Sequence, residues 1–360
     1  MNLRQYLGVA LLIVAGGMLV SPRAIAASQI LEATGKVFVK LEGTSEYRAA
    51  GVGTELYWGD VIRPEQGAKV KVLCVNRDDT TNKWNVPAGT ESGLGRGCPN
   101  AVTYRFNLRG RGEDIFLLFL RGEFVYETQV LEAMPILQWQ AVNGATDYEV
   151  QVNQADTKVW SQSVADTKIR YAGTALQEGE VYQVTVAAVG QEQASLLQLE
   201  RLTVQERELM EMKIRQVESL DFSEEGKAIA RAIIYQEVEK GTEQTQKKTG
   251  LVMEAIAALE PVSSTSQTPY VHRLLGDLYL QVGWLEQADA AYQKAIDFSA
   301  LGQNRTEWTL AQFGLANIAA AKDDIAAAEM RLQMAKVGYL LLGDTDQVEL
   351  MSQRMEKLKL

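Results

Sequence analysis

The sequence has few of the side chains that most often carry metal binding or nucleophilic catalysis. Its 360 residues include one histidine, His272, and two cysteines, which is a poor inventory for either kind of chemistry and excludes a zinc site of the HExxH type. Prolines number only seven, and 46% of the residues are hydrophobic, which excludes a largely disordered or collagen-like chain. We therefore expect a folded protein with no metal, no cofactor and no enzymatic activity.

An excess of positive charge is also missing. Lys and Arg total 36 and Asp and Glu total 46, which gives a formal net charge of −10. Such a chain has no overall basic field to attract nucleic acid or anionic lipid, so the expected partners are proteins or neutral ligands. At about 150 residues per domain, the length suggests two or three domains.

The N-terminus matches the pattern of a secretory signal peptide. A basic start at Arg4 precedes an apolar stretch from Tyr6 to Val20, and the small-x-small triplet from Ala24 to Ala26 follows. We place cleavage after Ala26, so that the mature protein is extracytoplasmic, either periplasmic or secreted. The alternative is an uncleaved membrane anchor, although the stretch is shorter than the roughly 20 residues that span a bilayer.

Residues 27 to 110 have the pattern of a small all-β domain, in which short strand-forming runs alternate with Gly, Asn and Asp. In one such run Val70, Val72 and Cys74 share a face, which directs Cys74 to the core. Cys98 lies in a glycine-rich loop 24 positions later. In an oxidising compartment this pair predicts a Cys74–Cys98 disulfide. A free thiol pair, or half of a metal site, is the alternative.

Part of this domain resembles the FecR-type extracytoplasmic domain. The resemblance rests on Leu56, Gly59 and Asp60 ahead of a strand, followed by Val70-Lys71-Val72. It implies a small all-β module on the envelope side of signalling proteins that report the state of outer-membrane transporters. In the full sensors a cytoplasmic helical region precedes the membrane span, whereas only five residues precede the apolar stretch here. Signalling across the membrane is therefore not expected.

A polar cluster follows the cysteine-bearing strand and consists of Asn76, Asp78, Asp79 and Asn82. It lacks the roughly 12-residue ligand spacing and the terminal bidentate Glu of a calcium loop. The cluster therefore predicts a solvated hairpin turn.

Residues 111 to 204 predict a β-sandwich. Tyr148, Val150 and Val152 alternate with polar residues, and Tyr182 and Val184 do the same, which is typical of strands with one buried face. Strands at this spacing, with glycines in the turns between them, favour a β-sandwich.

The middle region resembles a fibronectin type III domain. Trp139 matches the buried tryptophan of an early strand, and Tyr182, six residues after Leu176, matches the tyrosine corner. The resemblance implies a spacer or adhesion module and assigns these residues to the core. The apolar run Ile115 to Leu120 is expected to be the first strand of the sandwich or a pad between the two β domains.

Residues 205 to 360 have the periodicity of α-helices. The clearest unit runs from His272 to Ala295 as a helix, a glycine turn and a second helix. Residues at the close approach of the two helices are small, and larger ones fill the space between them. The small residues are Gly276, Ala288 and Ala295, and the larger ones are Leu275, Tyr279 and Tyr292.

This unit resembles a tetratricopeptide repeat (TPR). A degenerate copy follows it, with Leu315, Leu332 and Ala335 at matching positions, and an earlier copy falls between Ala232 and Leu259. A helix from Asp344 to the C-terminus is expected to cap the stack. The predicted fold is thus multidomain, with an all-β FecR-like domain, a fibronectin III-like sandwich and an all-α array of helical hairpins.

The TPR resemblance implies that the first helices of successive hairpins line a concave groove, which holds an extended peptide or a partner helix. Arg273 is expected to pair with a carboxylate, and Asn317 to bond a peptide backbone. Solvation, or contact with a neighbouring helix, is the alternative for each residue. His272 is expected to be structural rather than catalytic. The predicted groove residues are Tyr270, Arg273, Asp277, Gln281, Phe313 and Asn317.

These features together predict an exported, non-enzymatic interaction scaffold that binds a protein or peptide of the cell envelope. No nucleic acid and no stable membrane span after cleavage are expected. The alternative is a binder of cell-wall glycan that uses Trp58 or Trp84 as a stacking platform, although core packing is favoured for both rings. A hydrolase that uses a carboxylate pair ranks third, because no spacing in the sequence identifies such a pair.

Overall fold

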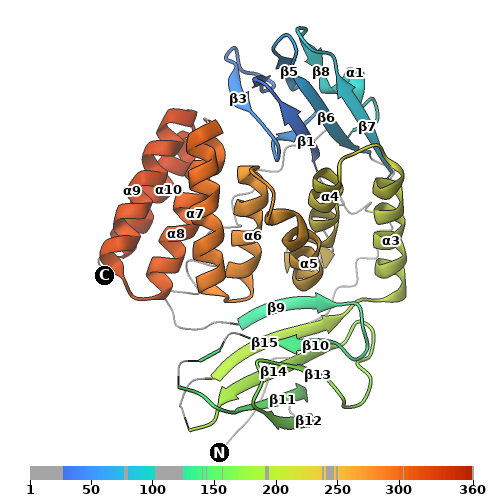
Figure 1. Cartoon of the computed structure of the whole chain (residues 1–360), viewed down its shortest axis with the longest axis vertical. Coiled ribbons are helices and arrows are strands. Elements are labelled where there is room, and N and C mark those ends of the chain that lie inside the picture. The colour runs from blue at the N-terminus through green and yellow to red at the C-terminus, as the bar shows by residue number, and fades with distance from the viewer. Residues whose placement is uncertain are drawn as a thin grey trace, which may run out of the picture.

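The computed structural model describes residues 27–76, 80–101, 125–139, 141–142, 144–155, 157–190, 194–236, 239–240, 247–248, 250–302 and 304–358. They form three regions stacked one above another (Figure 1). Strands β1 to β8 with the short helix α1 make up the first β region, and strands β9 to β15 make up the second β region. Helices α3 to α10 form the helical array between them. The expected order, β-rich first and helical last, is confirmed.

Three sequence predictions fall outside the described residues. They concern the signal peptide (1–26), the apolar run Ile115 to Leu120, and Asp78 with Asp79 of the polar cluster. Within the described ranges, none of the helices is long and apolar enough to cross a membrane.

The first β region contains two four-stranded sheets, in the orders β4-β1-β6-β7 and β3-β2-β5-β8. All neighbouring strands in them run antiparallel. The bounds are β1 Ser28–Thr34, β2 Val37–Lys40, β3 Arg48–Ala50, β4 Glu55–Leu56, β5 Val61–Pro64, β6 Lys69–Val75, β7 Thr81–Val86, β8 Ser92–Gly93 and α1 Leu94–Gly97.

Both faces of the sheet that contains β1 and β6 are buried. Successive side chains of a strand point to opposite faces, so Ile30 enters the core between the two sheets while Leu31 packs among the helices. On β6, Val72 and Leu73 divide in the same way. The run of apolar residues in β6 therefore reflects two buried faces, as in strands covered on both sides.

The residues that carry the FecR resemblance have structural tasks. Leu56 is buried in the first β region, and Gly59 has φ 95°, a conformation that favours glycine. The fully buried Asp60 carboxylate accepts the backbone N–H groups of Glu42 at 2.9 Å and Tyr57 at 3.1 Å. Because a buried carboxylate needs such donors, this short motif closes a turn ahead of β5.

The predicted disulfide between Cys74 and Cys98 is confirmed. Both cysteines are fully buried, and their Cα atoms lie 5.5 Å apart. Cys98 directly follows helix α1, where the sequence predicted a loop. The bond ties this helix to the core strand β6.

The described part of the polar cluster lies in the β6–β7 hairpin. The Asn76 amide donates to the Thr80 hydroxyl and to the Asn82 side-chain oxygen, both at 3.0 Å. Among the described residues, no group of three or more His, Cys, Asp or Glu side chains is placed to hold a metal ion.

The second β region has a five-stranded sheet in the order β12-β11-β14-β15-β9 and a two-stranded sheet of β10 and β13. Strand β9 pairs parallel with β15, and the other pairs are antiparallel. The bounds are β9 Val125–Val130, β10 Ile136–Gln138, β11 Tyr148–Gln154, β12 Thr157–Val164, β13 Lys168–Arg170, β14 Val181–Ala188 and β15 Ala194–Arg201.

The alternation predicted for the second β region is present. Tyr148, Val150 and Val152 are buried on one face of β11, and Tyr182 and Val184 are buried on the same side of the neighbouring strand β14. The sheet therefore buries one face in a core of its own.

Two aromatic residues fix the edges of this core. The Trp139 ring meets Tyr148 edge to face, with centroids 5.5 Å apart. The Tyr182 hydroxyl accepts the backbone N–H of Gln177 at 3.0 Å, next to the buried Leu176. Tyr182 is buried, as the sequence predicted, whereas Trp139 is half-buried and directly follows β10.

The helical array consists of hairpins that stand side by side (Figure 1). Helices α4 and α5, α6 and α7, and α8 and α9 pack as successive pairs, and α6 also packs against α8. The bounds are α3 Val204–Ser219, α4 Glu224–Gln236, α5 Val252–Ser263, α6 Pro269–Gln281, α7 Leu285–Gly302, α8 Arg305–Ala321, α9 Ile325–Leu342 and α10 Thr345–Lys357, with short strands β16 Glu239–Lys240 and β17 Lys247–Lys248.

Tyr292 fills the space between three helices of the array. Its ring, on α7, lies against Gly276 of α6 and Gly314 of α8. A Cβ atom at either glycine would fall 2.6 Å or 2.2 Å from the ring. The small residue predicted at Gly276 is thus required by the Tyr292 ring, and the same ring explains Gly314.

The array contacts both β regions. From the first β region, Lys83 pairs with Asp221 at 2.7 Å, and the Thr81 backbone N–H donates to Gln216 at 3.0 Å. From the second, the backbone N–H of Gln129 on β9 donates to the Gly250 carbonyl at 3.2 Å, just before α5. These contacts lie between α3 and the start of α5, whereas the later helices α8 to α10 lie to one side of the molecule (Figure 1).

Candidate functional site

The predicted groove centres on Arg273, whose charge is used inside the molecule. Its guanidinium donates from Nε to the Glu307 carboxylate on α8 and from Nη1 to Asp277 one turn along α6. The side chains of Arg273 and Glu307 are only 13% and 6% exposed. Burial opposes the charge of Arg273, but the two carboxylates hold its pKa well above the ordinary range.

Asp277 joins this network to the third helix. Its second carboxylate oxygen accepts the Tyr292 hydroxyl at 2.7 Å. Burial, together with this carboxylate, raises the pKa of Tyr292 well above its usual range. The Asp277 side chain is still 44% exposed, so it is the open edge of a cluster that ties α6, α7 and α8 together.

Tyr270 does not face an open groove. It is 6% exposed, and its ring lies against Gly53 of the first β region, where a Cβ atom would come within 2.0 Å. The Gln29 amide donates to its hydroxyl at 2.9 Å, and burial raises the pKa of Tyr270 to about 12. The prediction that Tyr270 contacts a partner is corrected, because the first β region covers the start of α6.

The other predicted groove residues are divided between α6 and α8. Gln281 is half-buried, one turn beyond Asp277. Phe313 is half-buried with the Arg354 guanidinium of α10 at 4.6 Å from its ring centre. Asn317 is 4% exposed, and its Oδ1 atom accepts no hydrogen bond from the described residues. Because the side chain is buried, a bound peptide backbone has little access to it.

Sequence reasoning missed Glu307 as the ion partner of Arg273. Glu307 stands three residues after Asn304, whose side chain accepts the Glu307 N–H and caps α8. An acidic residue at this position is explained by the helix start alone, so nothing in the local pattern marked it as a buried ion partner. His272 is buried, stacks on Phe298 and bonds the Ser266 carbonyl at 3.0 Å, which agrees with a structural role.

A hollow of about 510 Å³ lies on α4 and α5, away from the predicted groove. Burial raises the pKa of Glu254, at this hollow, to about 7, and Glu132 adds to the rise. One oxygen of Glu254 has no hydrogen-bond partner among the described residues. The lining residues are Glu224, Arg231, Tyr235, Glu254, Ala257, Ala258, Pro261 and Val262.

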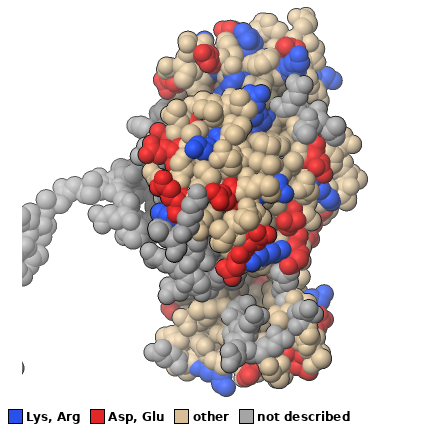
Figure 2. Space-filling view, turned by 90° about the vertical axis from the view of Figure 1, so that its left-hand side faces the viewer, with Lys and Arg blue, Asp and Glu red and all other residues tan. Residues whose placement is uncertain are grey.

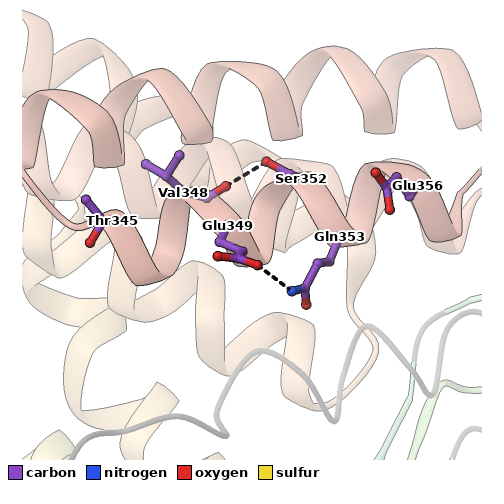
Figure 3. Close-up of a pocket in the computed structure, with 6 residues that line it drawn as sticks. All are labelled: Thr345, Val348, Glu349, Ser352, Gln353 and Glu356. Carbon is purple, nitrogen blue, oxygen red and sulfur yellow. Dashed lines mark hydrogen bonds between the residues drawn. The ribbon is translucent and has the colours of Figure 1, made fainter.

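A second hollow, of about 600 Å³, runs along α10 (Figure 3). The described residues that line it all belong to this helix, and two of their polar groups are bonded within it. Gln353 donates to Glu349 at 3.3 Å, and the Ser352 hydroxyl donates to the Val348 carbonyl at 2.9 Å. A hollow lined by a single helix is a shallow surface feature, and its side chains do not indicate a class of ligand. The residues are Thr345, Val348, Glu349, Ser352, Gln353 and Glu356.

Helix α9 exposes apolar side chains along much of its length. Of the twelve large hydrophobic residues exposed among those described, six lie on this one helix, each between 36% and 63% exposed. An exposed apolar area of this kind is a candidate interaction surface. On the side of the molecule where α9 and α10 lie, uncharged surface predominates, with both basic and acidic side chains scattered over it and at its margins (Figure 2). The six residues are Ile325, Met330, Met334, Val337, Leu340 and Leu341.

The two tryptophans proposed as glycan platforms differ in placement. Trp84 is half-buried, and its ring lies so close to Gly97 that a Cβ atom there would come within 1.9 Å. Trp58 is 37% exposed and packs one edge against Gly95. Trp84 is thus a packing residue beside the disulfide, whereas Trp58 leaves part of its ring in solvent.

No protein-family model matches the chain, and no curated protein matches it either. Among solved structures, the crystal structure of MamA is similar at 13% sequence identity. The match covers 43% of this chain and 91% of MamA, with a TM-score of 0.25. The class defined by this chain's own fold is a multidomain protein with β sheets in its N-terminal part and a C-terminal array of packed helices.

Proposed function

We propose that this protein is a non-enzymatic, extracytoplasmic interaction scaffold of the cell envelope, in which the helical array binds a partner protein. The single observation that carries the proposal is the exposed apolar face of α9. Burying such a surface against a partner is favourable by roughly 25 cal/mol per Å² of apolar area, whereas leaving it in water serves no purpose in the fold.

The partner surface in this proposal is α9 rather than the inner face predicted from the TPR resemblance. Arg273 is already paired with two carboxylates, and Tyr270 lies beneath the first β region. A partner carboxylate at Arg273 would have to displace Glu307, which would leave that side chain buried without its cation. The inner face therefore supports the array, and α9 remains available to a partner.

Two features support an extracytoplasmic location. The N-terminal sequence has the pattern of a signal peptide, and the first β region contains a buried disulfide, a bond that forms and persists in oxidising compartments. In this proposal the second β region acts as a spacer beneath the array. FecR-like, fibronectin III-like and TPR-like folds remain the proposed assignments for the three regions.

Affinity capture on the mature chain tests the proposal. The variant Met334→Glu/Val337→Glu places two charges on the exposed face of α9, and Leu209→Glu places one on α3 at a site that is 41% exposed. We expect an envelope protein that is captured by the wild type and by Leu209→Glu but lost with the α9 variant. A partner retained by all three proteins would show that α9 is not the docking surface.

A second candidate function rests on Trp58. An aromatic ring that is partly exposed on a β turn can stack against a sugar ring, as a cell-wall glycan binder requires. Sedimentation of the mature protein with purified cell wall distinguishes this function from the first. Glycan binding predicts co-sedimentation that Trp58→Ala abolishes, whereas a protein scaffold predicts that the protein stays in the supernatant.

A further inference from the structure

The exposed apolar residues of α9 form a straight stripe. Met330, Met334, Val337 and Leu341 are spaced by four, three and four residues. At about 100° per residue, this spacing keeps all four within about 60° of arc and over about 16 Å of helix length. We call these four residues the α9 stripe. It has the spacing of a seam by which one helix packs along another.

The stripe lies opposite the side of α9 that faces the array. Ala328, Leu332, Ala335 and Tyr339 are buried and form a core with residues of α8 and α10. These residues fall on the far side of the helix from the stripe. Helix α9 is therefore apolar on two opposite faces, of which the array covers one.

The ends of the stripe are acidic. Asp323 and Asp324 are exposed just before α9, and Asp344 and Asp346 are exposed just after it. Three cations lie near the stripe. Lys322 is 3.8 Å from Glu286, Arg331 donates to Gln312 at 2.9 Å, and Lys336 is half-buried on α9 between the acidic ends. A partner that covers the apolar centre therefore meets negative charge at each end.

This charge pattern distinguishes between the kinds of partner that could cover an apolar stripe. A second copy of the chain, aligned on its own α9, would bring acidic ends close to acidic ends in either orientation, which is unfavourable. A membrane surface with anionic lipids would be repelled for the same reason. A helix with an apolar seam and basic ends meets apolar contact along the stripe and electrostatic attraction at its two ends.

We infer that the α9 stripe binds an amphipathic helix of a partner protein, whose apolar seam is flanked by Lys or Arg at both ends. This inference rests on the proposed function, because it names the chemistry of the partner at the same surface. The apolar residues supply contact area, and the acidic ends set the orientation and specificity of the partner.

A pair of synthetic peptides provides the test, with the mature full-length chain as receptor. Each peptide is a helix of about 18 residues with Leu at four-three-four spacing. One carries Lys at both ends and the other carries Glu. We expect saturable binding of the Lys peptide, measured by fluorescence anisotropy, with at least about tenfold weaker binding of the Glu peptide. Equal affinity for the two peptides would overturn the inference.

Matched variants of the chain locate the binding. Met334→Glu/Val337→Glu is expected to weaken the Lys peptide by at least about tenfold, while Leu209→Glu leaves it unchanged. Asp323→Asn/Asp346→Asn is expected to weaken the Lys peptide and to strengthen the Glu peptide. Asn is tolerated at position 323, where φ is 55°. Loss of binding with Leu209→Glu, or no effect of the α9 variants, would contradict the inference.

Two further measurements decide among occupants and separate this inference from the proposed function. If sedimentation equilibrium shows a dimer that Val337→Glu dissociates, the occupant of the stripe is a second copy of the chain. If the protein binds vesicles of phosphatidylcholine and phosphatidylglycerol in equal parts, the occupant is a membrane surface. Either result would overturn the inference of a helical partner. If Met334→Glu/Val337→Glu abolishes capture of an envelope protein but Asp323→Asn/Asp346→Asn does not, the scaffold function stands and the basic helix is wrong. If neither affects capture, both fail.

Discussion

At the scale of single residues, the buried charges of this protein act as structural connections. Arg273 and Glu307 join α6 to α8, and Asp277 links the same cation to Tyr292 on α7. A buried ion pair of this kind is costly to form but even more costly to break, because the remaining partner is left without compensation. Mutations in this network are therefore expected to report on stability before they report on binding.

Removing the cation of the network should destabilise the protein strongly. In Arg273→Ala the Glu307 carboxylate, 6% exposed, loses its partner, and we expect a loss of about 3–5 kcal/mol in the free energy of unfolding. Urea denaturation measures this loss. The double variant Arg273→Met/Glu307→Leu should lose less than Arg273→Ala. Equal stability of Arg273→Ala and the wild type would contradict the buried pair.

A second residue-scale prediction concerns Glu254, whose pKa is raised by burial from 4.5 to about 7. The folded state holds this proton more tightly than the unfolded state. The resulting stability is therefore complete below about pH 4.5 and is lost as the pH rises through about 7. Glu254→Gln mimics the protonated form. We expect it to raise the melting temperature above about pH 7 and to leave it nearly unchanged near pH 4.5. A melting-temperature difference that is the same at both pH values would contradict the raised pKa.

At the scale of elements, close helix packing depends on glycines that face an aromatic ring. Tyr292 lies between Gly276 and Gly314, with no room for a methyl group at either position. Alanine normally favours a helix over glycine by about 1 kcal/mol. At these two positions the gain in helix propensity is opposed by a clash with the Tyr292 ring. The clash is the larger effect, so the net change in stability is a loss.

We therefore expect Gly314→Ala to destabilise the protein by about 1–3 kcal/mol, despite its better helix propensity. Its added Cβ would lie 2.2 Å from the Tyr292 ring. Thermal unfolding of the single variant and of Gly314→Ala in a Tyr292→Leu background measures the effect. The alanine should cost less in the second background. The same cost in both would mean that the ring is not the obstacle.

The sequence predicted the elements of this protein better than their surroundings. The hairpin of α6 and α7, the disulfide and the alternation in β11 follow local rules, because Gly276, Cys74 and Val150 each act through neighbours on the same or the next element. Tyr270 and Glu307 do not follow such rules. Tyr270 is covered by Gly53, more than 200 positions away, and Glu307 has the appearance of an ordinary helix start.

The exposed apolar face of α9 could not be predicted from the sequence for a related reason. This helix is apolar on two opposite sides, so its periodicity does not separate a buried face from an exposed one. Leu332 and Ala335, which matched the repeat pattern, are buried, whereas Met334 and Val337 between and beyond them are exposed. Only the packing of α8 and α10 on one side shows which face is free for a partner.

At the scale of the whole molecule, the first β region holds the beginning of the array in place. The side chains of Leu31 and Leu73, on strands β1 and β6, pack in the helical core, and the Tyr270 ring packs against Gly53. Most contacts between the regions involve the helices up to α6. The last hairpin, α8 and α9, lies at the end of the array away from them (Figure 1).

Two glycines test this connection between regions. Gly53 and Gly43 both have positive φ, at 89° and 77°, but a Cβ atom at Gly53 meets Tyr270 whereas one at Gly43 meets no atom within 4 Å. Gly53→Ala should therefore destabilise the protein more than Gly43→Ala, and hydrogen exchange should increase at the start of α6 in the first variant alone. Equal effects of the two substitutions would mean that strain in the backbone, and not contact between the regions, sets their cost.

The central claim is that partners dock on α9 rather than on the inner face of the array. Hydrogen–deuterium exchange of the mature chain, with and without its captured partner, tests this claim most directly. The account predicts protection over Ile325–Leu342, with little change over Pro269–Gln281 and Arg305–Ala321. Protection over those two inner helices, with α9 unchanged, would contradict it.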